Sequence, residues 1–269
     1  KKVIIMARLS KNVLKLQQKI NDILEQDILS RQDKLFVYEH FNEAVLVEVN
    51  RCAAFFTPLD LAWEVALEVV DHETPQRVLD LCAGIGMLAF STLSRNSMAE
   101  IVCVEQNPEF VRIGRKLLPE AKWICCSLED TETLKSLGIF DVVVSNPPYG
   151  VVPSMKDVKS SRYTGELAHF KAIDIASNLG NYGVFLIPQS DAGFKLSGVQ
   201  CYERCISSAH QKFFDETGIE ITPSCGIDTT AYTPFKNTKI VTEITTMQFP
   251  VDHCFKDDPL VEEQLTLSL

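Results

Sequence analysis

The feature that most constrains this fold is an alternation of short apolar runs with helical patterns, which begins near residue 74. The runs are rich in β-branched residues and bounded by turn residues. They are Arg77–Leu81, Glu100–Glu105, Trp123–Cys126, Phe140–Ser145 and Gly183–Pro188. Strands that alternate with helices in this way form a parallel sheet covered by helices on both faces. We therefore predict an α/β domain built on such a sheet.

The two ends of the chain follow different patterns. Apolar residues between positions 12 and 29 recur at three- and four-residue steps, which predicts one face of a helix. They are Val13, Leu16, Ile20, Ile23, Leu24 and Ile28. A second helical stretch is expected from about Lys34 to Asn50, so residues 1–50 are predicted as a helical N-terminal prefix. Residues 51–269 are predicted as the main domain, because 269 residues leave room for one large core.

Near the C-terminus, residues 218–222 and 239–249 indicate two strands that are joined without an obvious helix. We expect an antiparallel hairpin that closes one edge of the sheet.

Composition excludes several classes of protein. No apolar run approaches the length of a membrane span, and no signal-peptide pattern precedes the first helical segment, so we expect a soluble, cytoplasmic protein without membrane contact. The nine cysteines lie mostly in strand-like runs, which favours reduced thiols over disulfides, and their spacing predicts no metal site. The formal net charge of −10 opposes nonspecific binding to phosphate, so any contact with nucleic acid must be local or supplied by a partner.

A glycine-rich turn follows the first strand of the sheet. Residues 80–86 have the sequence Asp-Leu-Cys-Ala-Gly-Ile-Gly and lead directly into a helical pattern. Such a turn lets a ligand approach the backbone at the carboxyl edge of the sheet. The dinucleotide fingerprint tolerates Ala89 at its third position, so the glycines alone leave NAD open. Asp80 favours the cationic amino group of a methionine over a pyrophosphate, and Glu105, at the end of the next strand, can accept ribose hydroxyls from either cofactor.

The turn after the strand Phe140–Ser145 decides between these cofactors. Residues 145–150 have the sequence Ser-Asn-Pro-Pro-Tyr-Gly, and residues 55–58 have the sequence Phe-Phe-Thr-Pro. Taken together, the glycine turn and residues 145–150 resemble the signature of the class I amino-methyltransferases, which is Asp-x-x-x-Gly-x-Gly followed by Asn/Asp-Pro-Pro-Tyr/Phe. Residues 55–58 are similar to the Phe-x-Thr-Pro motif of the gamma-ordered N6-adenine DNA methyltransferases and of type I modification subunits.

This resemblance spans residues 55–150, continues less distinctly to the terminal hairpin and does not include the prefix. It implies a Rossmann-like, seven-stranded methyltransferase sheet and S-adenosylmethionine (SAM) as the cofactor. The residues that it implies for SAM binding are Thr57, Pro58, Asp80, Cys82, Ala83, Gly84, Gly86, Glu105, Ser127, Leu128 and Asn146. Members of the family usually place an acid near the adenine ring of SAM, whereas this chain has Ser127 there, so Glu129 or Asp130 takes that role or Ser127 and the Leu128 backbone suffice.

The chemistry of an adenine amine explains the catalytic turn. Its nitrogen is a poor nucleophile because the lone pair is delocalised into the ring, so well-aimed acceptors must draw it towards tetrahedral geometry. The Asn146 side-chain oxygen and the Pro147 carbonyl can accept the two hydrogens. Pro147 and Pro148 stiffen the turn, and Tyr149 offers a face on which a flipped base can stack.

Two further segments are candidates for binding the acceptor. Lys156, Lys159 and Arg162 form a basic loop that can bind a phosphate backbone, although a solvated loop is an equal alternative. Phe235 matches the aromatic residue that the family stacks on the other face of the target base, although a core aromatic is equally expected.

The resemblance implies a SAM-dependent enzyme that methylates adenine N6 in DNA, alone or as a catalytic subunit. An RNA adenine or protein-glutamine N-methyltransferase is an alternative, and so is a non-catalytic scaffold with the same fold. Because so acidic a chain is poorly equipped to hold a distorted duplex, we expect the prefix to bind a partner protein or a second copy. The competing expectation is that the apolar face of the prefix caps the chain's own sheet.

Overall fold

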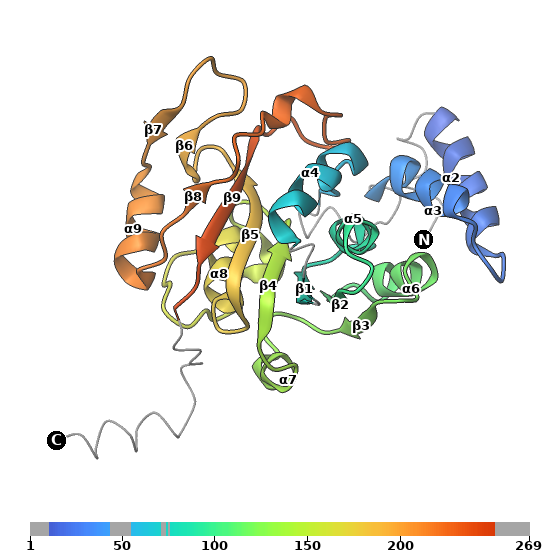
Figure 1. Ribbon diagram of the computed structural model, residues 1–269, viewed down its shortest axis with the longest axis horizontal. Helices are drawn as coiled ribbons and strands as arrows, with labels where there is room; N and C mark the ends of the chain where they lie inside the picture. Colours follow the sequence, from blue (N-terminus) through green and yellow to red (C-terminus); the bar gives the residue numbers. More distant parts are fainter. Residues whose placement is uncertain (1–10, 44–54, 71–73, 75, 251–269) are drawn as a thin grey trace.

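The computed structural model describes residues 11–43, 55–70, 74 and 76–250. Its centre is a seven-stranded sheet in the order β3-β2-β1-β4-β5-β9-β8 (Figure 1). The strands are β1 (Arg77–Leu81), β2 (Glu100–Glu105), β3 (Lys122–Cys125), β4 (Phe140–Ser145), β5 (Gly180–Pro188), β8 (Thr222–Pro223) and β9 (Thr242–Gln248). The first five strands along the sheet are parallel, β9 runs antiparallel to β5, and β8 pairs antiparallel with β9. The predicted parallel sheet and its antiparallel C-terminal hairpin are both confirmed.

Helices cover both faces of the sheet. On one face lie α4 (Leu59–Val69), α5 (Met87–Arg95) and α6 (Pro108–Leu117), and on the other lie α7 (Thr131–Ser136), α8 (Ala168–Ala176) and α9 (Ser208–Thr217). Successive strand residues point to opposite faces, so Val78 joins the first core and Leu79 the second. This two-sided burial explains the runs of consecutive apolar residues within the parallel strands.

The segment between β5 and β9 carries elements that the sequence did not predict. A separate two-stranded antiparallel sheet forms from β6 (Gly193–Lys195) and β7 (Glu203–Cys205). Two short 3-10 helices also form, η3 (Pro153–Met155) after β4 and η4 (Thr229–Ala231) before β9.

The prefix contains two helices, α2 (Lys11–Leu24) and α3 (Arg31–His40), which lie beside α5 and α6 in Figure 1. The second helix begins earlier than predicted because Ser30 and Asp33 form a capping box. It ends at His40, and residues 44–50 of the predicted helix lie outside the described residues, as does the predicted domain boundary.

The apolar face of α2 packs on the chain's own core. Ile20 is fully buried and Ile23 is 5% exposed, both within the cluster that includes α5 and α6 residues. The prediction was wrong for Ile28, which is 86% exposed because the first helix stops at Leu24 and the chain turns before α3. The capping alternative therefore accounts for Ile20 and Ile23, and partner binding by other parts of the prefix stays a prediction.

No helix in the described ranges combines the length and the apolar character that crossing a membrane requires.

Candidate functional site

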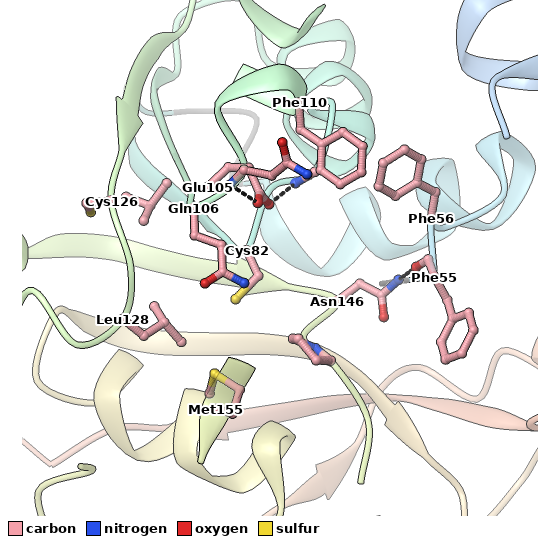
Figure 2. Close-up of a pocket in the computed structure, with 14 residues that line it drawn as sticks. Phe55, Phe56, Cys82, Glu105, Gln106, Phe110, Cys126, Leu128, Asn146 and Met155 are labelled. Carbon is pink, nitrogen blue, oxygen red and sulfur yellow. Dashed lines mark hydrogen bonds between the residues drawn. The ribbon is translucent and has the colours of Figure 1, made fainter. Parts of the chain in front are cut away.

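The predicted site residues meet at the carboxyl edge of the sheet, where β1, β2 and β4 end. A cavity there is lined by six of them, together with residues from other elements (Figure 2). The six are Cys82, Gly84, Glu105, Leu128, Asn146 and Pro148. A smaller adjoining hollow is lined by Thr57, Asp80 and Ala83, and shares Cys82, Gly84 and Asn146 with the cavity.

The glycine turn uses left-handed backbone conformations, which its glycine-rich sequence allows. Cys82, Gly84 and Gly86 all have positive φ angles, of 62°, 58° and 88°. A Cβ atom on Gly84 would lie 2.8 Å from Cε1 of Phe56, and one on Gly86 would lie 2.9 Å from the Trp123 ring. The two glycines are therefore needed both for the backbone conformation and for close packing around the cavity.

Asp80, at the start of this turn, has among the described residues a hydrogen-bond partner for one carboxylate oxygen and none for the other. Its side chain is almost fully buried, and Oδ2 accepts a hydrogen bond of 3.0 Å from the backbone N–H of Ala89 near the start of α5. Oδ1 is also buried and has no hydrogen-bond partner. Burial raises the pKa of Asp80 to about 8. A cation at Oδ1 would restore the charged form, which fits the predicted interaction with an ammonium group.

Glu105 faces the cavity from the end of β2, held by two backbone groups (Figure 2). Oε2 accepts a hydrogen bond of 2.9 Å from the Gly84 N–H, and Oε1 accepts one of 2.8 Å from the Asn107 N–H. Burial nevertheless raises the pKa of Glu105 to about 7. Each carboxylate oxygen has further lone pairs, so the fixed side chain can still accept hydroxyl groups.

Asn146 joins the two motifs that lie furthest apart in the sequence. Its Nδ2 donates to the Phe55 carbonyl at 2.7 Å and to Thr57 Oγ1 at 2.9 Å. The Tyr149 hydroxyl donates to Asn146 Oδ1. Burial raises the pKa of Tyr149 well above its usual value, so this hydroxyl stays protonated and serves as a donor. The Phe-Phe-Thr-Pro and Asn-Pro-Pro-Tyr segments thus form one unit.

Tyr149 differs from its predicted role. Its side chain is buried, and its ring centroid lies 6.0 Å from that of Phe55, in a tilted contact. The ring therefore does not present an open face for stacking, and the hydroxyl contact with Asn146 is its main polar interaction. Phe55 is half-buried and lines the cavity instead.

The segment after β3 contains the residues that the sequence offered for the adenine end of the cofactor site. Leu128 lines the cavity, whereas Ser127, Glu129 and Asp130 do not. Asp130 caps α7, since its side chain accepts a hydrogen bond from the Thr133 N–H. The cavity wall at this end is thus apolar, and neither candidate acid contributes to it.

The basic loop divides into two parts. Lys156 and Lys159 are exposed, as binding a phosphate requires. Arg162 instead donates from Nε to the buried carboxylate of Asp174 at 3.0 Å, and its guanidinium also bonds the Ser177 hydroxyl at 2.6 Å. We therefore correct its assignment, because these internal contacts occupy the guanidinium that a phosphate would need.

Phe235 is also placed differently from the prediction. It is half-buried, packs against the core beside α4 and lines a separate hollow with Leu61. It does not line the cavity, so the structure favours the core alternative for this residue.

Several cavity residues were not predicted from the sequence. They are Phe55, Phe56, Val104, Gln106, Asn107, Phe110, Cys126 and Met155. Gln106, Asn107 and Phe110 directly follow Glu105, so the end of β2 was a usable signal for them. Nothing in the local pattern marks Met155, which reaches the cavity through the fold of the loop after β4 (Figure 2).

The residues present fit SAM. The unpartnered Asp80 oxygen suits its ammonium group, Glu105 suits its ribose hydroxyls, and Leu128 lies in an apolar wall suited to its adenine ring. Among the residues that the structure describes, no three His, Cys, Asp or Glu side chains gather to hold a metal ion, and the cysteines are free thiols.

Comparisons with known proteins agree with this fold. Residues 52–159 match the family described as Methyltransferase small domain. A solved structure from Listeria monocytogenes, assigned to the class I SAM-dependent methyltransferases, is similar over 95% of this chain and 83% of its own, with a TM-score of 0.54 and 18% identity. The methyltransferase subunit of a type I restriction-modification system from Streptococcus thermophilus is similar over 89% of this chain and 63% of its own, with a TM-score of 0.52 and 15% identity.

No curated protein sequence matches this chain. The family match and the shared Rossmann-like fold support a SAM-dependent methyltransferase and SAM as its cofactor.

Proposed function

We propose that this methyltransferase-fold chain transfers a methyl group from SAM to the exocyclic amine of adenine in DNA. The observation that carries the proposal is the Asn146 amide, which is held by Phe55 and Thr57 at the end of β4, next to the cavity that fits SAM. An amide oxygen fixed in this place is an acceptor for an amine, as a nitrogen-directed transfer requires.

The chemistry divides between the cofactor and the protein. When bound, SAM would supply an electrophilic methyl group on its sulfonium. The S–CH3 bond would break as the N–CH3 bond forms, leaving S-adenosylhomocysteine, and the amine would release one proton to solvent. Asp80 and Glu105 hold the two polar ends of the cofactor site, and the positive-φ turn brings the backbone close to it. Asn146 Oδ1 and the Pro147 carbonyl accept the two amine hydrogens, which localises the lone pair on the nitrogen. Tyr149 occupies one lone pair of Oδ1 and leaves the other for the acceptor.

DNA adenine is preferred over RNA adenine or glutamine for two reasons. The Phe-Phe-Thr-Pro segment, typical of the N6-adenine DNA methyltransferases, contacts Asn146 directly. The fold is also shared with a type I restriction-modification methyltransferase subunit. Lys156 and Lys159 would supply local phosphate contacts on this acidic chain.

The test is tritiated methyl transfer from SAM to DNA, RNA and a release-factor protein, assayed in parallel. We expect incorporation into DNA, recovered as N6-methyladenine after digestion. Transfer to RNA or protein alone would overturn the choice of acceptor. Absence of transfer to all three would favour the non-catalytic scaffold.

Asn146→Ala tests the mechanism separately. We expect turnover to fall at least about a hundredfold while calorimetry still detects SAM binding, because the acceptor contacts matter chiefly in the transition state. Unchanged turnover would exclude Asn146 as the amine acceptor.

A further inference from the structure

The orientation of the Asn146 amide can be read from its partners. The Phe55 carbonyl is only an acceptor, so the atom that lies 2.7 Å from it must be Nδ2 (Figure 2). The Tyr149 hydroxyl then donates to Oδ1 on the opposite side of the amide. The oxygen, rather than the nitrogen, is therefore the atom left for an incoming amine.

The Phe55 carbonyl selects this orientation, and Thr57 supplies the second contact that holds Nδ2 in it. Its side chain is 3% exposed, and its Oγ1 accepts the other Nδ2 hydrogen at 2.9 Å. Rotation about the terminal torsion of an asparagine is broad and nearly two-fold, so hydrogen bonds decide which end faces which group. With the amide reversed, Nδ2 would face the acceptor amine, and two donors would oppose each other.

We propose that Thr57 is a positioning residue for methyl transfer, in addition to lining the cofactor site. Its hydroxyl holds Asn146 so that Oδ1 receives the amine hydrogen, and it thereby links the segment before α4 to the turn after β4. This inference rests on the proposed function, since it assigns a role within the same acceptor site.

The kinetic test uses Thr57→Val, which keeps the shape of the side chain and removes the hydroxyl. We expect kcat to fall about tenfold on an adenine-containing oligodeoxynucleotide, because a slightly misplaced acceptor loses much of its effect. Saturating SAM removes any loss of cofactor affinity from the measurement. Thr57→Ser returns the hydroxyl and should recover most of the lost kcat.

Thr217→Val is the matched control. It also removes a buried hydroxyl, one that donates to the Phe213 carbonyl at 2.7 Å in α9, away from the cavity. We expect its kcat to match that of the wild type even if its melting temperature falls as far as that of Thr57→Val. Equal kcat in Thr57→Val and the wild type would overturn the proposal, and so would equal losses in the two valine variants.

A second measurement does not depend on the acceptor. The side-chain amide protons of Asn146 can be assigned by NMR from their loss in Asn146→Ala. In Thr57→Val their hydrogen exchange should accelerate roughly fivefold, as loss of one hydrogen bond predicts, and Thr57→Ser should restore slow exchange. Unchanged exchange in Thr57→Val would refute the positioning role. The expected change, with no methyl transfer to DNA, would support Thr57 while rejecting the proposed acceptor.

Discussion

Gly84→Ala is the substitution whose effect follows most directly from the structure. Gly84 has a φ of 58°, and an alanine in that left-handed region costs about 1–2 kcal/mol. The added Cβ would also lie 2.8 Å from Cε1 of Phe56, so the ring must move, at a cost of about 1–3 kcal/mol for overpacking. Together these give about 2–5 kcal/mol, which corresponds to a fall of roughly 4–20 °C in melting temperature for a chain of this size.

The same substitution should weaken the cofactor. Both Gly84 and Phe56 line the cavity, so displacement of the ring changes its shape, and we expect the Kd for SAM to rise at least about tenfold, or about 1.4 kcal/mol. Thermal melts and calorimetry measure the two effects on one preparation.

Gly218→Ala is the matched control for the backbone term. Gly218 has a similar φ of 69° at the end of α9, and nothing lies within 4 Å of its would-be Cβ. The free energy of unfolding of Gly218→Ala should fall only by the cost of a left-handed alanine, about 1–2 kcal/mol, and its affinity for SAM should not change. If the two alanine variants lose equal stability and bind SAM equally well, the steric argument about Phe56 is wrong.

Three further predictions concern charged groups. Folding raises the pKa of Asp80 from 3.8 to about 8. Between these two pH values the folded state keeps a proton that the unfolded state releases. Asp80 therefore lowers the free energy of unfolding as the pH rises from about 4 to 8. In denaturant titrations at pH 5 and pH 8, Asp80→Asn should show a smaller difference than the wild type, with Glu105 supplying part of what remains. Arg162→Met should cost about 3–5 kcal/mol, because it removes the cation from the buried Asp174 carboxylate and leaves it only backbone N–H donors, yet calorimetry should still detect SAM binding to the folded variant. Replacing Lys156 and Lys159 with alanine should change the free energy of unfolding by less than about 0.5 kcal/mol. The slope of the logarithm of duplex affinity against the logarithm of salt concentration should fall by the equivalent of about two phosphate contacts. An unchanged slope would show that these two lysines do not contact the acceptor.

Local sequence patterns were sufficient for most of the sheet. The strand Phe140–Ser145 was predicted with its observed bounds, because a strand buried on both faces carries a continuous apolar run, here Val142, Val143 and Val144. The end of α2 was less predictable. Ile28 continues the helical period of the apolar residues, yet the chain leaves the helix after Leu24 and Ser30 caps the next one. The cap that Ser30 provides for α3 decided the structure there, rather than the periodicity of the apolar residues.

The sequence by itself determined the residues whose roles depend on nearby backbone. Gly84 must adopt a positive φ in its turn, and Glu105 must end a strand at the carboxyl edge. Only the tertiary structure decided which side chains meet across long separations. Asn146 bonds Phe55 from 91 positions away, and Arg162 is held by contacts that no local pattern encodes. Residue type and spacing define what a group can donate or accept, whereas packing of distant segments determines which partner it finds.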